Sequence, residues 1–163
     1  MRIRDLLLAD AAQVDAQAKI HTLGLGWTHI PTPTPPIAIV SVVELQPEEV
    51  PTAFEIKFEL LDADKLPAVL PPDARGESGA FSVTGNTSAV WAENAPEWQF
   101  HEPMFVPFAL TIGPGIPLDP GTYYFRATLN PESNDAPTEL IRFRVRPPEE
   151  PGPPAPAGES PEQ

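Results

Sequence analysis

Apolar and polar residues alternate along several short stretches of the chain, and this period of two predicts β-strands. The clearest stretch is 54–60, where two phenylalanines, an isoleucine and a leucine alternate with two glutamates and a lysine. Residues 123–129 and 140–146 alternate in the same way, so we expect them to pair as the last hairpin. Residues 37–45 are nearly all apolar and β-branched, which predicts a central strand buried on both faces.

Other stretches give weaker strand signals. Residues 2–8 predict a short strand, and the residues after it predict a connecting loop with at most one helical turn. Residues 19–30 are interpreted as one strand interrupted by two glycines. Residues 81–83 predict a short strand that ends at a glycine–asparagine turn. In residues 98–112 two prolines share one parity, which places this stretch at a sheet edge or breaks it in two.

The stretch 118–129 carries the most specific fold signal. It combines Asp119, Gly121, Tyr123 and Phe125 in the order Asp-x-Gly-x-Tyr-x-Phe. This order resembles the tyrosine corner of immunoglobulin-like sandwiches, where a tyrosine hydroxyl bends back to a backbone group just upstream. Phe125 stands where an antibody domain has its second cysteine. We therefore expect an all-β, immunoglobulin-like, two-sheet antiparallel sandwich of about seven to eight strands.

Composition divides the 163 residues into one domain and a tail. The domain is expected over residues 1–146, and residues 147–163 consist almost entirely of proline, glutamate and small residues. Such a segment cannot bury a core, so we expect a disordered tail. The apolar run near the start is four residues long, too short for a signal peptide, and no stretch is long enough to span a membrane. A cytoplasmic protein is expected.

Charge and missing residue types exclude several functions. The formal net charge is −13, which repels a phosphate backbone and argues against nucleic acid or an anionic membrane surface as a partner. The chain has no cysteine, which excludes a disulfide, a thiolate metal site and a cysteine nucleophile. No Gly-x-Ser-x-Gly elbow, phosphate loop or dinucleotide fingerprint occurs. We expect no enzyme, no cofactor and no small-molecule substrate.

Histidines and loop carboxylates offer little for a metal. His21 and His29 are eight residues apart on one predicted strand, so they cannot share an ion unless the glycines fold that strand back. His101 is remote from both. Asp62 and Asp64 lie at a turn, but a calcium site needs six or more oxygens. We expect no metal site, although calcium at such loop carboxylates stays open.

Outward arginines form the first candidate binding surface. Four arginines fall on the outward positions of the last two predicted strands: Arg126, Arg142, Arg144 and Arg146. In an acidic protein this row either pairs with neighbours such as Glu55 and Glu59, or forms a docking surface for an acidic partner or a second subunit.

Trp91 and Trp98 form the second candidate, since they flank a short acidic and proline-containing loop. They either plug one end of the sandwich or anchor a protein interface, where tryptophan is enriched.

Several motifs together resemble a family of short, uncharacterised bacterial proteins, classed as a domain of unknown function. They are a Leu-rich strand that ends in Ala-Asp at residues 7–10, a Lys-x-x-x-Leu-Gly-x-Gly segment within 19–28, the strand at 54–64 and a closing Pro-Gly-x-Tyr strand at 118–125. The resemblance implies a β-sandwich and carries no known activity. The leading hypothesis is a protein-binding or assembly module. The alternative is a head or tail component of a phage-like particle, and an uncharacterised enzyme is a minor alternative.

Overall fold

The computed structural model describes residues 1–71, 78–113 and 116–148, so most of the predicted tail lies outside the described residues. The described chain contains no α-helix and only two short 3-10 helices, η1 (Pro47–Glu49) and η2 (Glu97–His101). The strands are β1 (Arg2–Ala9), β2 (Ala11–Val14), β3 (Ile20–Leu23), β4 (His29–Ile30), β5 (Ile37–Leu45), β6 (Thr52–Leu61), β7 (Val69–Leu70), β8 (Gly79–Ala80), β9 (Ser82–Ala89), β10 (Met104–Ile112), β11 (Gly121–Leu129) and β12 (Thr138–Val145). The prediction of an all-β protein is confirmed.

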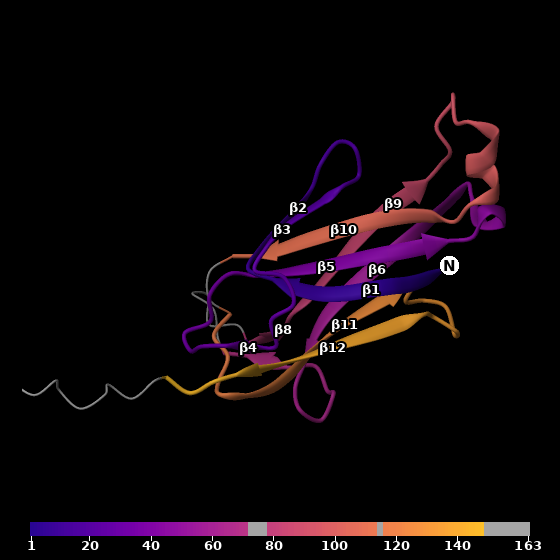
Figure 1. Cartoon of the computed structure of the whole chain (residues 1–163). Coiled ribbons are helices and arrows are strands. Elements are labelled where there is room, and N and C mark those ends of the chain that lie inside the picture. Colours follow the sequence, from indigo (N-terminus) through magenta and orange to yellow (C-terminus); the bar gives the residue numbers. More distant parts are fainter. Residues whose placement is uncertain (72–77, 114–115, 149–163) are drawn as a thin grey trace, which may run out of the picture.

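Two larger sheets and two small hairpins make up the architecture (Figure 1). The three-stranded sheet has the order β1-β5-β10, and the five-stranded sheet has the order β4-β12-β11-β6-β9. Neighbouring strands are antiparallel except for β4 and β12, which are parallel. The remaining sheets are the pairs β2-β3 and β7-β8.

The predicted two-sheet sandwich of seven to eight strands is not confirmed, since the described chain has twelve strands in four sheets. The excess consists of the five strands that are only two to four residues long. Strands this short contain too few residues to show an alternating pattern. Of the seven long strands of eight to ten residues, alternation or apolar runs reveal six, and β9 is the exception.

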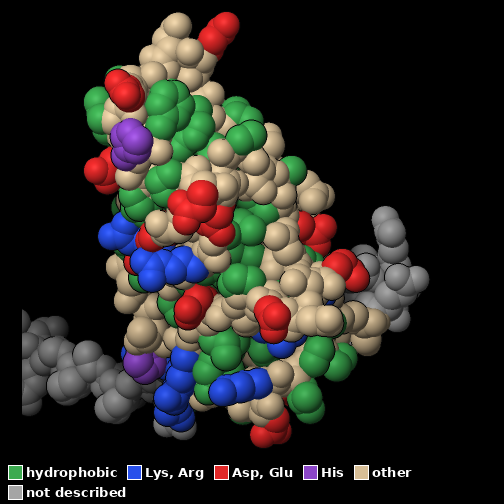
Figure 2. Space-filling view, turned by 90° about the vertical axis from the view of Figure 1, so that its right-hand side faces the viewer, with side chains coloured by type: hydrophobic (Ala, Val, Ile, Leu, Met, Phe, Trp, Pro, Cys, Tyr) green, Lys and Arg blue, Asp and Glu red, His purple; other side chains and the backbone are tan. Residues whose placement is uncertain are grey.

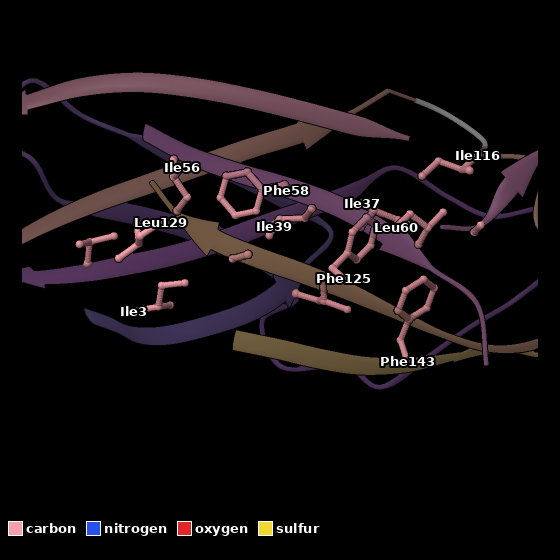
Figure 3. Packing of buried hydrophobic residues seen from close by; sticks show 14 of the residues in the cluster. Ile3, Ile37, Ile39, Ile56, Phe58, Leu60, Ile116, Phe125, Leu129 and Phe143 are labelled. Atoms are coloured by element: carbon pink, nitrogen blue, oxygen red, sulfur yellow. The ribbon is translucent and has the colours of Figure 1, made fainter. Parts of the chain in front are cut away.

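A single buried cluster joins the two larger sheets. Ile39 of β5 and Ile3 of β1 belong to the same cluster as Phe58, Phe125 and Phe143 of the five-stranded sheet (Figure 3). Every second residue of β6 and β11 points into this cluster, as alternation predicts. β5 is the middle strand of its sheet and almost entirely buried, and β11 pairs with β12. The predictions for the central strand and the last hairpin are therefore confirmed.

The predicted single strand at 19–30 is wrong. Gly24 and Gly26 have φ angles of +65° and +86°, values that glycine adopts without steric cost, and the chain turns there. β3 before the turn pairs with β2, whereas β4 after it pairs with β12. The predicted loop after residue 8 is also wrong, since it contains β2.

The predicted turn at the glycine–asparagine pair is wrong as well. Gly85 and its neighbour lie in the middle of β9, which runs continuously beside the ten-residue strand β6. A Cβ at Gly85 would lie 3.9 Å from the Cγ2 of Ile56, so Gly85 lies directly over this buried side chain of β6. Pairing with a long, buried strand holds this segment extended against its local turn preference.

The prediction for the stretch 98–112 agrees with the structure only in part. Trp98 lies in η2 and not in a strand, whereas β10 lies at the sheet edge, where the prolines of this stretch predict it.

The hydroxyl of Tyr123 donates a hydrogen bond to the backbone oxygen of Asp119 at 3.1 Å. This is the bond that the tyrosine-corner pattern predicts. Gly121 lies under the tyrosine ring, where a Cβ would be 3.5 Å from it. Partial burial raises the pKa of the Tyr123 hydroxyl, and the charges of Asp119 and Asp62 act in the same direction.

Candidate protein-binding surface

Alternation along β12 turns three arginines to the outer face of the five-stranded sheet. Phe143 and Val145 are buried in the core, whereas Arg142, Arg144 and Arg146 beside them are exposed. Because side chains two residues apart on a strand share a face, the three guanidinium groups project from the same side at a repeat of about 7 Å. This part of the sequence-based prediction agrees with the structure.

β4 adds a histidine to these arginines. The two-residue strand runs parallel to β12 with His29 opposite Arg144, and Ile30 is buried opposite Val145, so His29 faces outward. Two backbone bonds hold the pair together: Arg144 N–H to Thr28 O at 2.9 Å, and Arg146 N–H to Ile30 O at 2.8 Å. We call His29, Arg142, Arg144 and Arg146 the basic face. The place of His29 on this surface could not be predicted from the sequence, because nothing local signals a two-residue strand.

Two shallow hollows lie around His29. One has a volume of about 340 Å³ and is lined by Thr28, His29, Arg142, Phe143 and Arg144. The other has a volume of about 430 Å³ and is lined by His29, Arg144, Arg146 and Pro147. Figure 2 shows a histidine and several lysine or arginine side chains gathered over the lower part of the molecule, where β4 and β12 lie in Figure 1. The basic face therefore combines positive charge with concave surface.

Ion pairing separates Arg126 from the other arginines. Arg126 binds the carboxylate of Glu59 through both Nε (3.0 Å) and Nη2 (2.8 Å), and Lys57 pairs with the same carboxylate at 2.9 Å. Arg126 lies opposite Leu140, not opposite an arginine. Within residues 1–71, 78–113 and 116–148, neither Glu55 nor any arginine of the basic face forms an ion pair. The predicted row thus splits into one paired arginine and three that have no ion-pair partner among the described residues.

Glu59 contributes to stability in a pH-dependent way. Partial burial alone would raise the pKa of its carboxyl, but hydrogen bonds and charges from Lys57 and Arg126 outweigh it and hold the pKa below the ordinary 4.5. A carboxyl with a lowered folded-state pKa stabilises the fold above its unfolded-state pKa, and this contribution is lost as the pH falls through the folded-state pKa.

We therefore expect Glu59→Gln to be less stable than the wild type at pH 7. The difference should shrink below pH 4.5 and close once Glu59 is protonated in the wild type. Urea unfolding of both proteins between pH 7 and pH 3 measures this difference. A gap that stays constant over the whole range would contradict it.

The two tryptophans do not plug the core. Neither belongs to the buried cluster, and Trp98 is 62% exposed in η2. Trp91 is half-buried and meets the ring of Phe100 edge-on, with a centroid distance of 5.5 Å. Figure 2 shows hydrophobic side chains gathered at the top of the molecule, over this part of the chain. The structure thus places Trp91 and Trp98 at the surface, at the opposite end from the basic face.

Several carboxylates serve as structural partners. The pKa values of Asp15 and Glu44 are lowered, mainly by hydrogen bonds from His21 and Arg2 respectively. In the turn at residue 62, one carboxylate oxygen of Asp62 accepts the backbone N–H groups of Asp64 and Leu66. In the described part of the chain no three His, Cys, Asp or Glu side chains gather as a metal would require. The carboxyl groups of Asp15 and Glu44 are held in the charged form by these donors, which suits ion pairing rather than proton donation.

A cavity of about 610 Å³ lies beside the tyrosine corner, lined by Asp119 and Tyr123 together with proline, threonine and apolar side chains, among them Leu70 and Leu118. Asp119 and Tyr123 are the ionisable side chains among the described walls, and the Tyr123 hydroxyl is bonded to the backbone oxygen of Asp119.

No family model matches the chain, and no curated protein matches it either. A solved structure that it resembles is the crystal structure of the PmoD soluble domain from Methylocystis sp. ATCC 49242 (Rockwell). The sequences are 12% identical, the match covers 86% of this chain and 88% of that one, and the TM-score is 0.35. A likeness of this size indicates neither a shared fold nor a shared function. Among the described residues, no helix is both long and apolar enough to cross a membrane.

Proposed function

We propose that this protein is a non-enzymatic binding module, an immunoglobulin-like sandwich whose basic face docks an acidic protein segment. The observation that carries the proposal is the set of three neighbouring arginines without an ion pair among the described residues. The chain carries 23 Asp and Glu against 10 Lys and Arg, so unpaired arginines are notable in it. Two like charges about 7 Å apart repel by roughly 0.6 kcal/mol even in water, and bound carboxylates would relieve this repulsion.

The spacing of the arginines favours an extended acidic peptide. Alternate side chains of an extended partner recur about every 7 Å, the same repeat as Arg142, Arg144 and Arg146. A Glu-x-Glu-x-Glu segment can therefore place one carboxylate on each guanidinium group, which binds carboxylates in a two-pronged geometry. A nucleic acid fits less well, because the −13 net charge of the chain repels an extended phosphate backbone beyond this small face.

A fluorescein-labelled peptide of alternating glutamate and threonine, with four glutamates, is a direct probe. We expect the double variant Arg144→Gln with Arg146→Gln to bind it at least about tenfold more weakly than the wild type, a loss of about 1.4 kcal/mol. Fluorescence anisotropy at low ionic strength measures both affinities. Raising the salt concentration should weaken wild-type binding, since the contacts are ionic and exposed.

Two controls separate docking from general charge attraction. Arg4→Gln with Lys19→Gln removes the same charge from exposed positions outside the basic face and should leave the affinity within about twofold. A peptide of the same composition with its four glutamates consecutive should bind more weakly than the alternating one. Equal losses in the two double variants would overturn the proposal.

A further inference from the structure

The outer strands of the two larger sheets differ in how their edges are protected. An edge strand presents free backbone N–H and C=O groups, and proteins prevent unwanted pairing there with charges, prolines, bulges or very short strands. β1 carries charged side chains and a register shift between Ile3 and Asp5. β10 contains Pro107 and packs against β2, and β4 is only two residues long. Each of these three edges has a protecting device.

The fourth edge, β9, has none of these devices. Its eight residues, Ser-Val-Thr-Gly-Asn-Thr-Ser-Ala, include no charged residue and no proline. Its ladder with β6 runs without a register shift from Ser82 opposite Glu59 to Ala89 opposite Thr52. Across residues 1–71, 78–113 and 116–148, no backbone hydrogen bond joins the other edge of β9 to another segment. Within the described part of the chain, half of its backbone groups therefore have no partner strand.

We propose that β9 pairs antiparallel with β9 of a second copy of this chain, joining two five-stranded sheets across a twofold axis. The side chains on the outer face of β9 are exposed and polar: Ser82, Thr84, Asn86 and Ser88. Those on the other face lie opposite buried residues of β6, such as Gly85 opposite Ile56.

Side-chain parity restricts the register of this dimer. Residues directly opposite in an antiparallel pair share a face, so outer side chains must meet outer side chains. A register centred on Gly85 does this, since it places Ser82 opposite the second copy's Ser88 and Thr84 opposite the second copy's Asn86. Hydroxyl and amide groups in these pairs can hydrogen-bond across the junction.

Charge does not oppose this contact, despite the net charge of −13. The nearest charged side chains on the same sheet are Glu55, Lys57 and Glu59 of β6. In the dimer the two copies of β6 would be three strand spacings apart, about 14 Å, which exceeds the Debye length of about 8 Å at physiological ionic strength. The β9 sequence is polar, uncharged and compatible with its own copy. It therefore favours pairing with β9 of a second copy of this chain over pairing with an acidic strand of another protein. The basic face lies on β12 and β4, beyond β6 and β11, and stays free.

Size-exclusion chromatography with light scattering tests the dimer. We expect a mass twice the 17.7 kDa of one chain for the wild type, and the mass of one chain for Thr84→Lys with Asn86→Lys, which opposes lysines across the axis. Ser133→Lys with Asn134→Lys adds the same charge at exposed turn positions and should remain dimeric. A monomeric wild type, or equal masses for the two lysine variants, would overturn the proposal. Arg144→Gln with Arg146→Gln should stay dimeric, which separates this proposal from that of the basic face.

Amide hydrogen exchange of the wild type keeps the test valid if a lysine variant fails to fold. In an unpaired edge strand, every second amide of residues 82–89 bonds to β6 and the others exchange with water. We expect these other amides to become protected as the protein concentration rises. Exchange at those amides that is fast and independent of concentration would overturn the dimer.

Discussion

Replacing Phe125 with alanine is expected to lower the free energy of unfolding by about 3–5 kcal/mol. The side chain is fully buried on β11, the middle strand of the five-stranded sheet. Its ring stacks on Phe143 with a centroid distance of 5.3 Å and meets Phe81 edge-on at 6.1 Å. Strands on both sides hold β11 in place, so the surrounding structure cannot collapse to fill the cavity. Urea unfolding at pH 7 measures the loss.

The matched control is Phe105→Ala. Phe105 is 43% exposed on the edge strand β10, and its ring lies under the guanidinium group of Arg4 at 4.8 Å. Little apolar surface is lost and water can occupy the space, so we expect a cost below about 1 kcal/mol. If the two substitutions cost the same, Phe125 is not part of a rigid core.

Val145→Asp should be at least as damaging, with a loss of about 4 kcal/mol or more. Val145 is 1% exposed, and the substitution would place a carboxylate in the core opposite Ile30. Burial of this carboxyl would raise its pKa, so the loss relative to the wild type should shrink as the pH falls and the group becomes neutral. Thermal unfolding followed by circular dichroism at pH 7 and pH 4.5 measures both effects.

Arg144→Asp, one residue earlier, is the control for strand orientation. Arg144 is exposed on the outer face, so we expect a change in stability within about 0.5 kcal/mol. The same substitution should weaken binding of the glutamate–threonine peptide. Similar losses of stability at positions 144 and 145 would mean that β12 does not alternate between core and surface.

The candidate site could be predicted only in part. Alternation within one strand indicated that Arg142, Arg144 and Arg146 face outward, because side-chain direction in a strand depends on parity alone. That Arg126 is neutralised by Glu59 depends on the register between β11 and β6. His29 belongs to the basic face because β4 pairs in parallel with β12, and these two segments are more than 100 residues apart in the chain. Pairing over such separations leaves no local pattern in the sequence.

The all-β class, six of the seven long strands and most of the buried residues follow from the sequence by itself. Period-two alternation is a local property of each strand and does not depend on which strand lies beside it. The last hairpin is also predictable, because its two strands are neighbours in the chain and are joined by a short connection. The short strands, the turn at Gly24 and the continuous strand through Gly85 were decided by tertiary structure. At Gly85 a local turn preference gave way to pairing with the long, buried strand β6.

That the arginines of the basic face have no ion-pair partner, and the outer edge of β9 no strand partner, among the described residues was also decided at that level. Whether a charge is neutralised or a strand edge is covered depends on which distant segment the fold brings to it. The sequence of a strand therefore determines which side chains face outward, and only the assembled sheets determine what those side chains meet.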